Sequence, residues 1–377
     1  MKFSTKEELH EHAVHQRVEQ GPVLSGAAMP RAESGEPRAE LTVADLGEHA
    51  LIERIRARVP PAPDFVPVGI GDDAAVVEPE RNNLEVITTD CLIEGIHFDR
   101  AFASAFDIGH KALAVNLSDL AAMGAAPRVA LLSLALPDSW PAADFDALLD
   151  GLLALAERVR IALVGGNIAR SPGPLVVDLT AIGTVKPRRL ITRAGARPGD
   201  ELYVSGTLGA SAAGLASLRA ARAGSAMPRA EGCEARHLRP QPRLRLGALL
   251  GRTRTARACV DLSDGLADGI RQLATASAVG ATVDAGEIPI DAEAQAWFER
   301  QGQSALDATL QGGEDYELLF AVSPRNRRRF EAVRRLVGDL PIRRIGHIMA
   351  KPLIELRRNG RVEELPTGFA HFAGGSR

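Results

Sequence analysis

Aromatic and cysteine residues are scarce in this sequence, and each shortage argues against a kind of function. Only 4% of the 377 residues are aromatic, which argues against a surface that stacks nucleic-acid bases. The three cysteines, Cys91, Cys233 and Cys259, are far apart and odd in number, so neither a zinc site nor a disulfide framework is expected. Unpaired thiols are typical of reducing compartments, and the sequence therefore predicts a cytoplasmic protein.

Long apolar runs and a strong net charge are missing too. No apolar run approaches the roughly 20 residues that a membrane-spanning helix needs. The N-terminal residues are polar and mixed in charge, unlike a secretory signal. The formal net charge is −3, from 45 basic and 48 acidic residues, which gives no global field to attract nucleic acid or an anionic membrane. We expect neither as a partner.

Three catalytic signatures are also absent. The sequence has no G-x-x-x-x-G-K-[ST] phosphate-binding loop. It has neither the H-R-D and D-F-G pair of protein kinases nor a G-x-S-x-G nucleophile elbow. An ATP-using enzyme with this sequence would therefore have to hold the phosphates chiefly through metal ions.

The chain is long enough for two domains, and its 45% apolar and 25% charged residues are ordinary for a globular protein. Residues 1–44 are rich in Glu, His, Arg, Pro and Gly without periodicity, so we expect a disordered extension. A hexamer at 28–33 recurs at 226–231. A duplicated hexamer would be tolerated where nothing packs tightly, so we interpret both copies as flexible surface segments.

Helices and strands are predicted to alternate through the first half of the folded part. Apolar spacing predicts helices from about residue 45 to 59, over 107–123 and over 141–159. It predicts strands over 74–77, 84–90, 129–136, 161–164 and 175–185, with a glycine turn after residue 164. We therefore predict an α/β domain over 45–187, followed by an α+β domain over 188–377.

Acidic and hydroxyl side chains gather at the ends of predicted strands. Two glycines lead into the adjacent carboxylates Asp72 and Asp73, and the next strand ends in Thr88, Thr89 and Asp90. Mg²⁺ takes oxygen ligands and is usually held by one or two carboxylates together with substrate phosphates. We therefore interpret these residues as one wall of a metal–nucleotide site.

The next predicted helix has an unusual polar centre, formed by Lys111, Asn116, Ser118 and Asp119. Asp119 lies among leucines and alanines, and a carboxylate buried there needs a partner. A cap or a salt bridge would provide one, but the other acids favour a metal ion. His97, in the loop before this helix, is either a plain surface side chain or a substrate contact.

Two further acidic turns occur in the second half. A short strand is followed by Asp261, Ser263 and Asp264 just before a helix, which is more oxygen side chains than capping requires. The segment G-G-E-D-Y-E-L (312–318) is a glycine turn that leads into a strand. Glu314 lies in this turn, where side chains usually reach ligands or solvent.

Five motifs, in this order, resemble the thiamine-monophosphate kinase family: G-I-G-D-D-A-A-V (69–76), T-T-D (88–90), K-A-L-A-V-N-L-S-D-L-A-A-M-G-A-x-P (111–127), D-L-S-D-G-L (261–266) and G-G-E-D-Y-E-L (312–318). The long helix motif by itself marks only a wider superfamily, which includes aminoimidazole-ribonucleotide synthetase, selenophosphate synthetase and a hydrogenase-maturation protein. The acidic last motif and the order of all five favour the thiamine kinase. The resemblance covers about residues 45–373.

This resemblance implies a fold, a reaction and an assembly. The N-terminal domain would be an ATP- and Mg²⁺-binding, dimer-forming domain of the aminoimidazole-ribonucleotide synthetase type, and the C-terminal domain would complete the active site. The reaction would be ATP-dependent phosphorylation of thiamine monophosphate to thiamine diphosphate, by direct in-line transfer assisted by several Mg²⁺ ions. The protein would be a homodimeric kinase of thiamine biosynthesis.

Matching positions in the motifs imply roles for individual residues. The implied metal ligands are Asp73, Thr88, Thr89, Asp90, Asp119, Asn167, Asp261 and Asp264. Among them, those implied to be catalytic are Asp73, Asp90, Asp119 and Asp264. The residues implied to contact thiamine monophosphate are His97, Glu314 and Phe369. Those implied to contact ATP are Gly166, Asn167, Arg193 and Ser263.

Asn167 departs from the family pattern, in which an acid follows the glycine pair. Asparagine keeps an oxygen ligand and loses a negative charge, so either one metal is held more weakly or a neighbour such as Asp178 compensates. Two alternatives to the thiamine kinase stay open at this point. One is another ATP-using enzyme of the superfamily, such as an aminoimidazole-ribonucleotide synthetase. The other is a catalytically silent nucleotide-binding protein, which Asn167 suggests.

Overall fold

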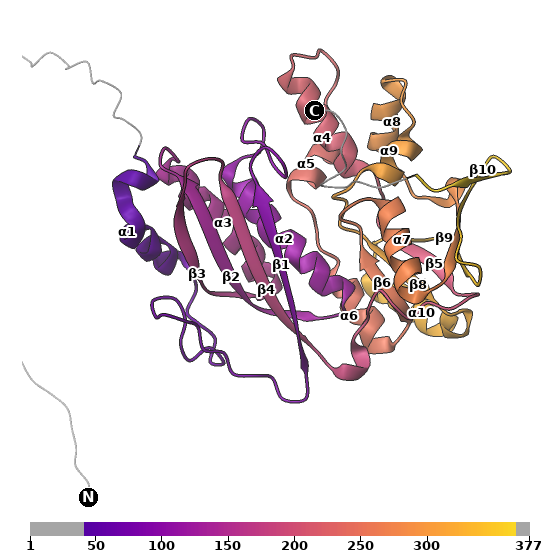
Figure 1. Ribbon diagram of the computed structural model, residues 1–377, viewed down its shortest axis with the longest axis horizontal. Helices are drawn as coiled ribbons and strands as arrows, with labels where there is room; N and C mark the ends of the chain where they lie inside the picture. The colour runs from indigo at the N-terminus through magenta and orange to yellow at the C-terminus, as the bar shows by residue number, and fades with distance from the viewer. Residues whose placement is uncertain (1–40, 367–377) are drawn as a thin grey trace, which may run out of the picture. The chain divides into compact units, whose positions relative to one another are not determined.

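Two β-sheets, each with its own helices, make up residues 41–366, the part of the chain that the computed structural model describes (Figure 1). Most of the predicted extension, the first copy of the hexamer and Phe369 lie outside these residues. The first sheet has the strand order β1-β4-β2-β3. Its strands are β1 (Leu84–Ile93), β2 (Ala126–Pro137), β3 (Ala162–Ser171) and β4 (Val176–Val185).

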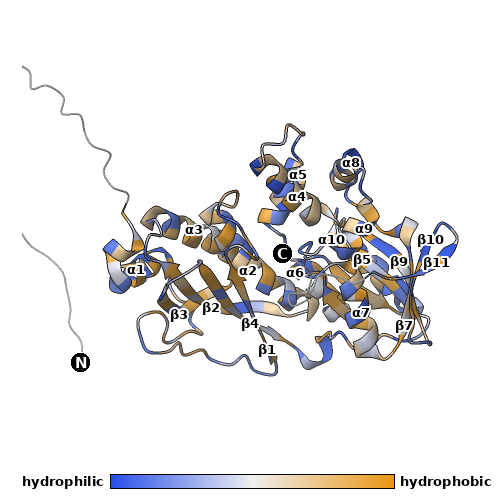
Figure 2. Ribbon diagram, turned by 45° about the horizontal axis from the view of Figure 1, so that its top comes forward, coloured by the Kyte–Doolittle hydropathy of each residue, from blue (hydrophilic) through white to orange (hydrophobic). Residues whose placement is uncertain are grey.

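Three helices accompany the first sheet: α1 (Val43–Arg58), α2 (Ala105–Ala122) and α3 (Ala142–Val159). Both α1 and α2 begin with a capping box, Thr42 with Asp45 and Ser104 with Asp107. These boxes satisfy backbone N–H groups that the first turn of a helix leaves unbonded. The apolar side chains of α2, α3 and one sheet face form a shared core, which Figure 2 shows as largely hydrophobic ribbon.

Helix α2 is the most enclosed element of this first half. All its residues are buried except Phe106 and Asp119. A helix that is buried on all sides is expected to be apolar, so the polar residues along α2 must find partners inside the protein. The predicted helix over 107–123 is therefore confirmed, and its polar centre marks where other elements meet it.

The glycine pair at 165 and 166 lies inside β3, so the turn expected after residue 164 is wrong. Leu131 pairs with Gly165 and Leu132 with Gly166, after a register shift between Ala130 and Leu131. A Cβ atom on Gly166 would lie 1.8 Å from the carbonyl oxygen of Leu132. The glycine is thus needed for close approach of two strands, which sequence alone does not distinguish from a turn.

The strand expected over 74–77 is also wrong. The segment makes isolated bridges only, between Val68 and Val76 and between Ile70 and Asp72. Gly71 has a left-handed φ of +113°, and the Asp72 side chain accepts the Asp73 N–H at 2.8 Å. Such local side-chain bonds compete with strand pairing, so the acids lie on a loop.

The second sheet has seven strands in the order β11-β10-β7-β9-β5-β8-β6. Its strands are β5 (Glu201–Ser205), β6 (Ala256–Asp261), β7 (Gly280–Asp284), β8 (Leu318–Val322), β9 (Ile342–Met349), β10 (Ile354–Arg358) and β11 (Arg361–Glu364). Along β8, Leu319 and Ala321 enter one core while Leu318, Phe320 and Val322 enter another. Because successive side chains alternate, this sheet is covered on both faces.

The helices of the second half are α4 (Ala210–Arg222), α5 (Glu231–Leu238), α6 (Leu244–Thr253), α7 (Leu266–Ser277), α8 (Ala292–Arg300), α9 (Ala305–Gln311) and α10 (Arg327–Val337). Three short 3₁₀ helices complete the structure: η1 (Pro187–Arg189), η2 (Ala285–Glu287) and η3 (Pro324–Asn326). No helix in the described range 41–366 is both long enough and apolar enough to cross a bilayer.

Helices α2 and α6 connect the two sheets. A Cβ atom on Gly247 of α6 would lie 1.9 Å from the carbonyl oxygen of Ala121 at the end of α2, so the glycine allows the two helices to touch. The α/β prediction is confirmed, because each of the two sheets packs against its own helices. The proposed division at residues 187 and 188 falls between the sheets and stays a prediction, because the described residues belong to one compact unit.

Candidate active site

A cavity of about 670 Å³ lies where elements of both sheets meet, and it is lined by β1, α2, α4 and the turns around residues 263 and 313. Leu92, Ile96, Val115, Leu215 and Tyr316 form its apolar lining. Its titratable and hydroxyl groups include Asp90, His97, Arg219, Ser263, Asp264 and Glu314. A space of this size, largely apolar with a few convergent polar groups, is typical of a small-molecule site.

Four carboxylates from the two halves interact here: Asp90 and Asp264 line the cavity, and the charge of Asp119 acts on both Asp90 and Asp261. Burial, followed by the charges of Asp119, Asp178 and Asp264, raises the pKa of Asp90 to about 6. Burial and the charge of Asp119 likewise raise the pKa of Asp261 to about 7. Carboxylates that repel one another across two sheets indicate a site built to receive positive charge.

Asp119 and Asp261 are each held by a hydroxyl of the first half, and the bond to Asp261 links the two halves. The Thr88 hydroxyl of β1 donates to the Asp119 carboxylate, and the Ser118 hydroxyl of α2 donates to the Asp261 carboxylate of β6 at 2.8 Å. Burial raises the pKa of Asp119 even though Thr88 and Arg193 act in the opposite direction. Arg193, predicted to contact ATP, thus lies within electrostatic reach of these acids.

The donor set fits Mg²⁺ only if further oxygens complete its coordination. In the range 41–366, no three His, Cys, Asp or Glu side chains are placed to hold a metal ion by themselves. Buried carboxylates and hydroxyls are the oxygen donors that Mg²⁺ takes, and it is commonly held by one or two carboxylates plus substrate phosphates. A cation that arrives with phosphate groups therefore suits this site.

Thr89 and Asn167 lie on the opposite face of the first sheet from Thr88 and Asp90. The Thr89 hydroxyl donates to Asp178 at 3.2 Å. Ser133 is the register partner of both Asp178 and Asn167, so two strand spacings, about 10 Å, separate these two residues. The carboxylate of Asp178 therefore lies beside Thr89, not beside Asn167.

Asp73 is not brought into the carboxylate cluster. It is exposed on the loop between α1 and β1. A Cβ atom on Gly71 of this loop would lie 2.4 Å from the Arg56 guanidinium of α1. The charges that shift the pKa values of Asp90 and Asp261 come from other residues.

Ser263 does lie at the site. It lines the cavity, its hydroxyl donates to Asp264 at 3.0 Å, and its carbonyl accepts the Glu314 N–H at 2.6 Å. The two acidic turns of the second half are therefore bonded to each other at the cavity.

Glu314 and His97 are joined by Lys111, a residue to which the sequence assigned no role. The Lys111 ammonium, only 3% exposed, lies 2.5 Å from a Glu314 carboxylate oxygen and donates to the His97 carbonyl at 3.1 Å. Burial opposes ionisation of Glu314, but Lys111, His237 and His97 together outweigh it and lower the pKa of that carboxyl. The cavity thus contains a fixed anion. The signal in the sequence was a lysine in the polar centre of a helix that is otherwise rich in leucine and alanine.

The turn that carries Glu314 has a strained backbone. Glu314 and Tyr316 have left-handed φ values of +66° and +50°, which for residues other than glycine cost about 1–3 kcal/mol each. The Asp315 carboxylate between them accepts the N–H groups of Gly209 at 2.7 Å and Ser211 at 3.1 Å. This acid therefore binds the N-terminus of α4, where an anion is favoured, and anchors the turn to that helix.

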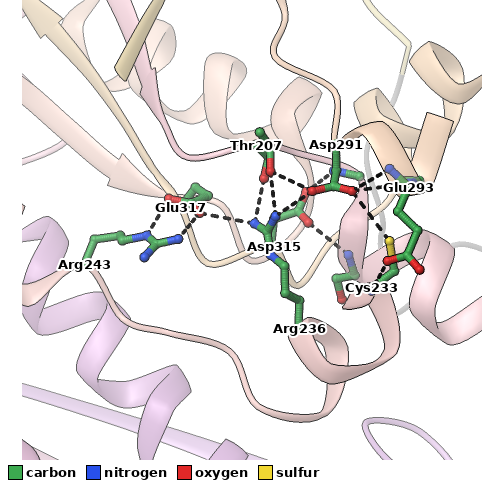
Figure 3. Close-up of polar contacts among 11 residues, drawn as sticks. Thr207, Cys233, Arg236, Arg243, Asp291, Glu293, Asp315 and Glu317 are labelled. Atoms are coloured by element: carbon green, nitrogen blue, oxygen red, sulfur yellow. Dashed lines mark hydrogen bonds and ion pairs between the residues drawn. The ribbon is translucent and has the colours of Figure 1, made fainter. Parts of the chain in front are cut away.

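Glu317 holds the other end of this turn in a buried ionic network (Figure 3). Its fully buried carboxylate accepts from Arg243 Nε at 2.7 Å, Arg236 at 3.3 Å and the Ser205 hydroxyl at 2.6 Å. Arg236 also bonds Asp291 at 3.2 Å. Asp315 and Glu317 are thus structural, and of the three acids in this motif only Glu314 lines the cavity.

Comparison with known protein families divides the chain into the same two parts. Residues 71–185 match the model of the N-terminal domain of AIR synthase related proteins, and residues 197–359 match the model of their C-terminal domain. The chain is 40% identical to the thiamine-monophosphate kinase of Escherichia coli K12 over 333 residues, 87% of this chain and 98% of that one.

Solved structures give the same result. The thiamine-monophosphate kinase from Stenotrophomonas maltophilia K279a matches with a TM-score of 0.72 and 40% identity, over 84% of this chain and 96% of that one. AaThiL complexed with AMPPCP and TMP matches with a TM-score of 0.68 and 32% identity, over 87% and 98%. Identity at this level across nearly the full length of these relatives means that the chain belongs to the thiamine-monophosphate kinase family.

Proposed function

We propose that this protein transfers the γ-phosphoryl group of ATP to thiamine monophosphate and so forms thiamine diphosphate. One observation carries the proposal: repelling carboxylates from both sheets adjoin a partly apolar cavity that also contains the Glu314 anion. The carboxylates suit a metal–phosphate group, and the cavity suits a cationic organic ring. The relative AaThiL, in complex with AMPPCP and TMP, supports the same pair of substrates.

The residues divide between the two substrates as follows. Asp90, Asp119, Asp261 and Asp264, with Thr88, would hold Mg²⁺ on the ATP side. Thr89, Asn167 and Asp73, which lie apart from this cluster, are proposed as ligands of further ions. Gly166, Arg193 and Ser263 would contact ATP, while His97 and Glu314 would contact thiamine monophosphate. Phe369 keeps its proposed stacking role but lies outside the described residues.

The proposed chemistry needs no general base. A phosphate oxygen of thiamine monophosphate, ionised near neutral pH, would attack the γ-phosphorus in line, and the bond from the γ-phosphorus to the bridging oxygen would break to release ADP. Such transfer depends on positioning and charge neutralisation. Mg²⁺, when bound, would screen the repulsion between the two phosphorylated substrates. The side chains of the protein would orient both phosphates and limit the access of water.

A turnover assay tests this function. The purified protein with ATP and Mg²⁺ is expected to convert thiamine monophosphate to thiamine diphosphate, measured by chromatography, and to lose this activity when EDTA is added. Release of ADP with formylglycinamidine ribonucleotide, and none with thiamine monophosphate, would favour an aminoimidazole-ribonucleotide synthetase instead. ATP binding without turnover of either substrate would indicate a silent nucleotide-binding protein.

Lys111 is expected to act on the thiamine side of this reaction. Replacing it by glutamine removes the cation that holds Glu314 and the His97 carbonyl together, so the KM for thiamine monophosphate should rise about tenfold, or about 1.4 kcal/mol. The KM for ATP should change much less. Initial rates with each substrate varied in turn would measure this, with the exposed Lys351→Gln as control. Equal changes in both KM values, together with a lower melting temperature, would mean that Lys111 is only structural.

We also propose a homodimer formed through the open face of the first sheet. On this face β1 exposes every second residue from Glu85 to Cys91, and Ile87 is 63% exposed; an apolar side chain on an uncovered sheet face suits a contact between subunits. Sedimentation velocity that returned a monomer at micromolar concentration would exclude it. The cytoplasm is the proposed location, supported by three free cysteines.

A further inference from the structure

Six basic side chains from two separate segments line two adjoining cavities away from the candidate active site. The cavities, of about 460 and 570 Å³, share the residues Lys186, Arg189 and Arg252. The six cations, hereafter the basic pocket, are Lys186, Arg188, Arg189, Arg245, Arg252 and Arg254. None of the residues that line them also lines the cavity at Asp90. The mechanism above uses none of the six cations.

The six cations of the basic pocket have little counter-charge in the described part of the chain, although Lys186 is among the charges that lower the pKa of Glu80. None of the six cations takes part in an ion pair or a side-chain hydrogen bond with a described residue, although such pairs are frequent elsewhere between residues 41 and 366. Glu80 is the one acid in the lining, and its carboxylate already accepts the Thr184 hydroxyl at 2.6 Å. A bound anion would relieve the repulsion among these like charges.

Helix geometry accounts for only part of this clustering. Arg252 is in the last turn of α6 and Arg254 is its C-cap, positions where a cation interacts favourably with the helix dipole. Lys186, Arg188 and Arg189 belong to η1 and the residue before it, and Arg245 is in the first turn of α6, where a cation is disfavoured. Four of the six therefore have no such explanation.

The backbone beneath the basic pocket is closely packed. A Cβ atom on Gly251 of α6 would lie 2.4 Å from the carbonyl oxygen of Arg189, and one on Gly124 would lie 3.3 Å from the same oxygen. These glycines let the η1 segment pack directly against α6 and the end of α2. The backbone that carries the cations is thus fixed before any ligand arrives, which limits the entropy lost when their exposed side chains bind it.

From this arrangement we propose that the basic pocket binds a compact polyphosphate anion, such as pyrophosphate, triphosphate or the phosphate chain of a nucleotide. Guanidinium groups bind phosphate oxygens in pairs, and five of them, together with the Lys186 ammonium, exceed what a single carboxylate requires. No aromatic side chain lines the two cavities, so stacking on nucleic-acid bases is not provided for. The proposal is independent of the transfer reaction and stands or falls separately from it.

Titration calorimetry with inorganic tripolyphosphate in EDTA tests the proposal. Without metal, the carboxylates of the active site repel the probe, so only the basic pocket should bind it. Wild-type protein is expected to bind about one tripolyphosphate per chain. The variant R189Q/R252Q should bind at least tenfold more weakly. The control R300Q/R357Q, which removes two exposed cations that form no ion pair within residues 41–366, should bind like the wild type. Asp264→Asn should not bind more weakly than the wild type.

Three results would overturn the proposal: no binding by the wild type, equal weakening in R189Q/R252Q and R300Q/R357Q, or tighter binding by Asp264→Asn than by the wild type, since this would place the probe at the active site. A fourth would be binding of single-stranded oligonucleotides that strengthens with length while tripolyphosphate does not bind, since this would indicate a nucleic-acid surface. Far-ultraviolet circular dichroism and thiamine monophosphate turnover of R189Q/R252Q, both expected to match the wild type, show that the variant is folded.

Discussion

The substitution Asp119→Asn is expected to lower kcat for thiamine diphosphate formation by about a hundredfold or more, because removing one anchoring charge costs several kcal/mol of transition-state stabilisation. Asparagine keeps the shape of the side chain and can still accept the hydrogen bond from Thr88. It removes only the negative charge that lies beside Asp261 and Asp90. Steady-state rates at saturating ATP, thiamine monophosphate and Mg²⁺ measure the effect.

Stability should move in the opposite direction in the same variant. The folded state raises the pKa of Asp119, chiefly through burial, so at neutral pH the charged form opposes folding. The neutral variant should therefore unfold at the same or a higher temperature than the wild type. Asp138→Asn, which breaks an exposed pair with Arg170, is the control and should keep full activity. Activity within twofold of the wild type in Asp119→Asn would remove this residue from the site.

The substitution Glu317→Gln is expected to destabilise the protein by about 3 kcal/mol, because it leaves Arg243 without its buried counter-charge and Arg236 with Asp291 alone. Glu317 is fully buried, whereas the two arginines are 30% and 24% exposed. Loss of this anion also loosens the left-handed turn at Glu314 and Tyr316, which the network holds in place (Figure 3). The midpoint of urea unfolding, followed by tryptophan fluorescence, measures the change.

A matched control separates the buried network from a general loss of one carboxylate. Glu364 is exposed on β11 and forms no ion pair within residues 41–366, so Glu364→Gln should change the free energy of unfolding by less than about 0.5 kcal/mol. If the two variants unfold at the same urea concentration, the ionic network contributes nothing to stability. In that case the strained turn must be held by Asp315 and the backbone bonds alone.

Local patterns predicted much of this structure. Apolar spacing located α2 and the flanking strands of the first sheet, since period and capping act over a few residues. The acidic motifs identified four carboxylates, Asp90, Asp119, Asp261 and Asp264, that do interact in the fold. Local patterns failed at Gly165 and Gly166, which are strand residues. A glycine that permits close strand approach and a glycine that permits a turn look alike in sequence.

Other features depend on contacts between residues far apart in the chain. Side chains alternate along a strand, so the sequence predicts that Thr88 and Thr89 lie on opposite faces of β1. Which of the two faces α2 depends on how β1 packs and pairs in the fold. Lys111 meets Glu314 across about 200 residues of sequence, and no local rule pairs them. The six cations of the basic pocket come from two segments that only the packing of η1 against α6 brings together.

The sequence by itself determined most of the element types, the family and the oxygen-rich character of the proposed metal-binding wall, because these depend on residue type and spacing along the chain. Only the tertiary structure decided which acids act on the cavity and which, like Asp315 and Glu317, stabilise the turn behind it. The physical reason is that packing between distant segments decides which partner a buried charge meets. The same packing decides how much it would cost to leave that charge unpaired.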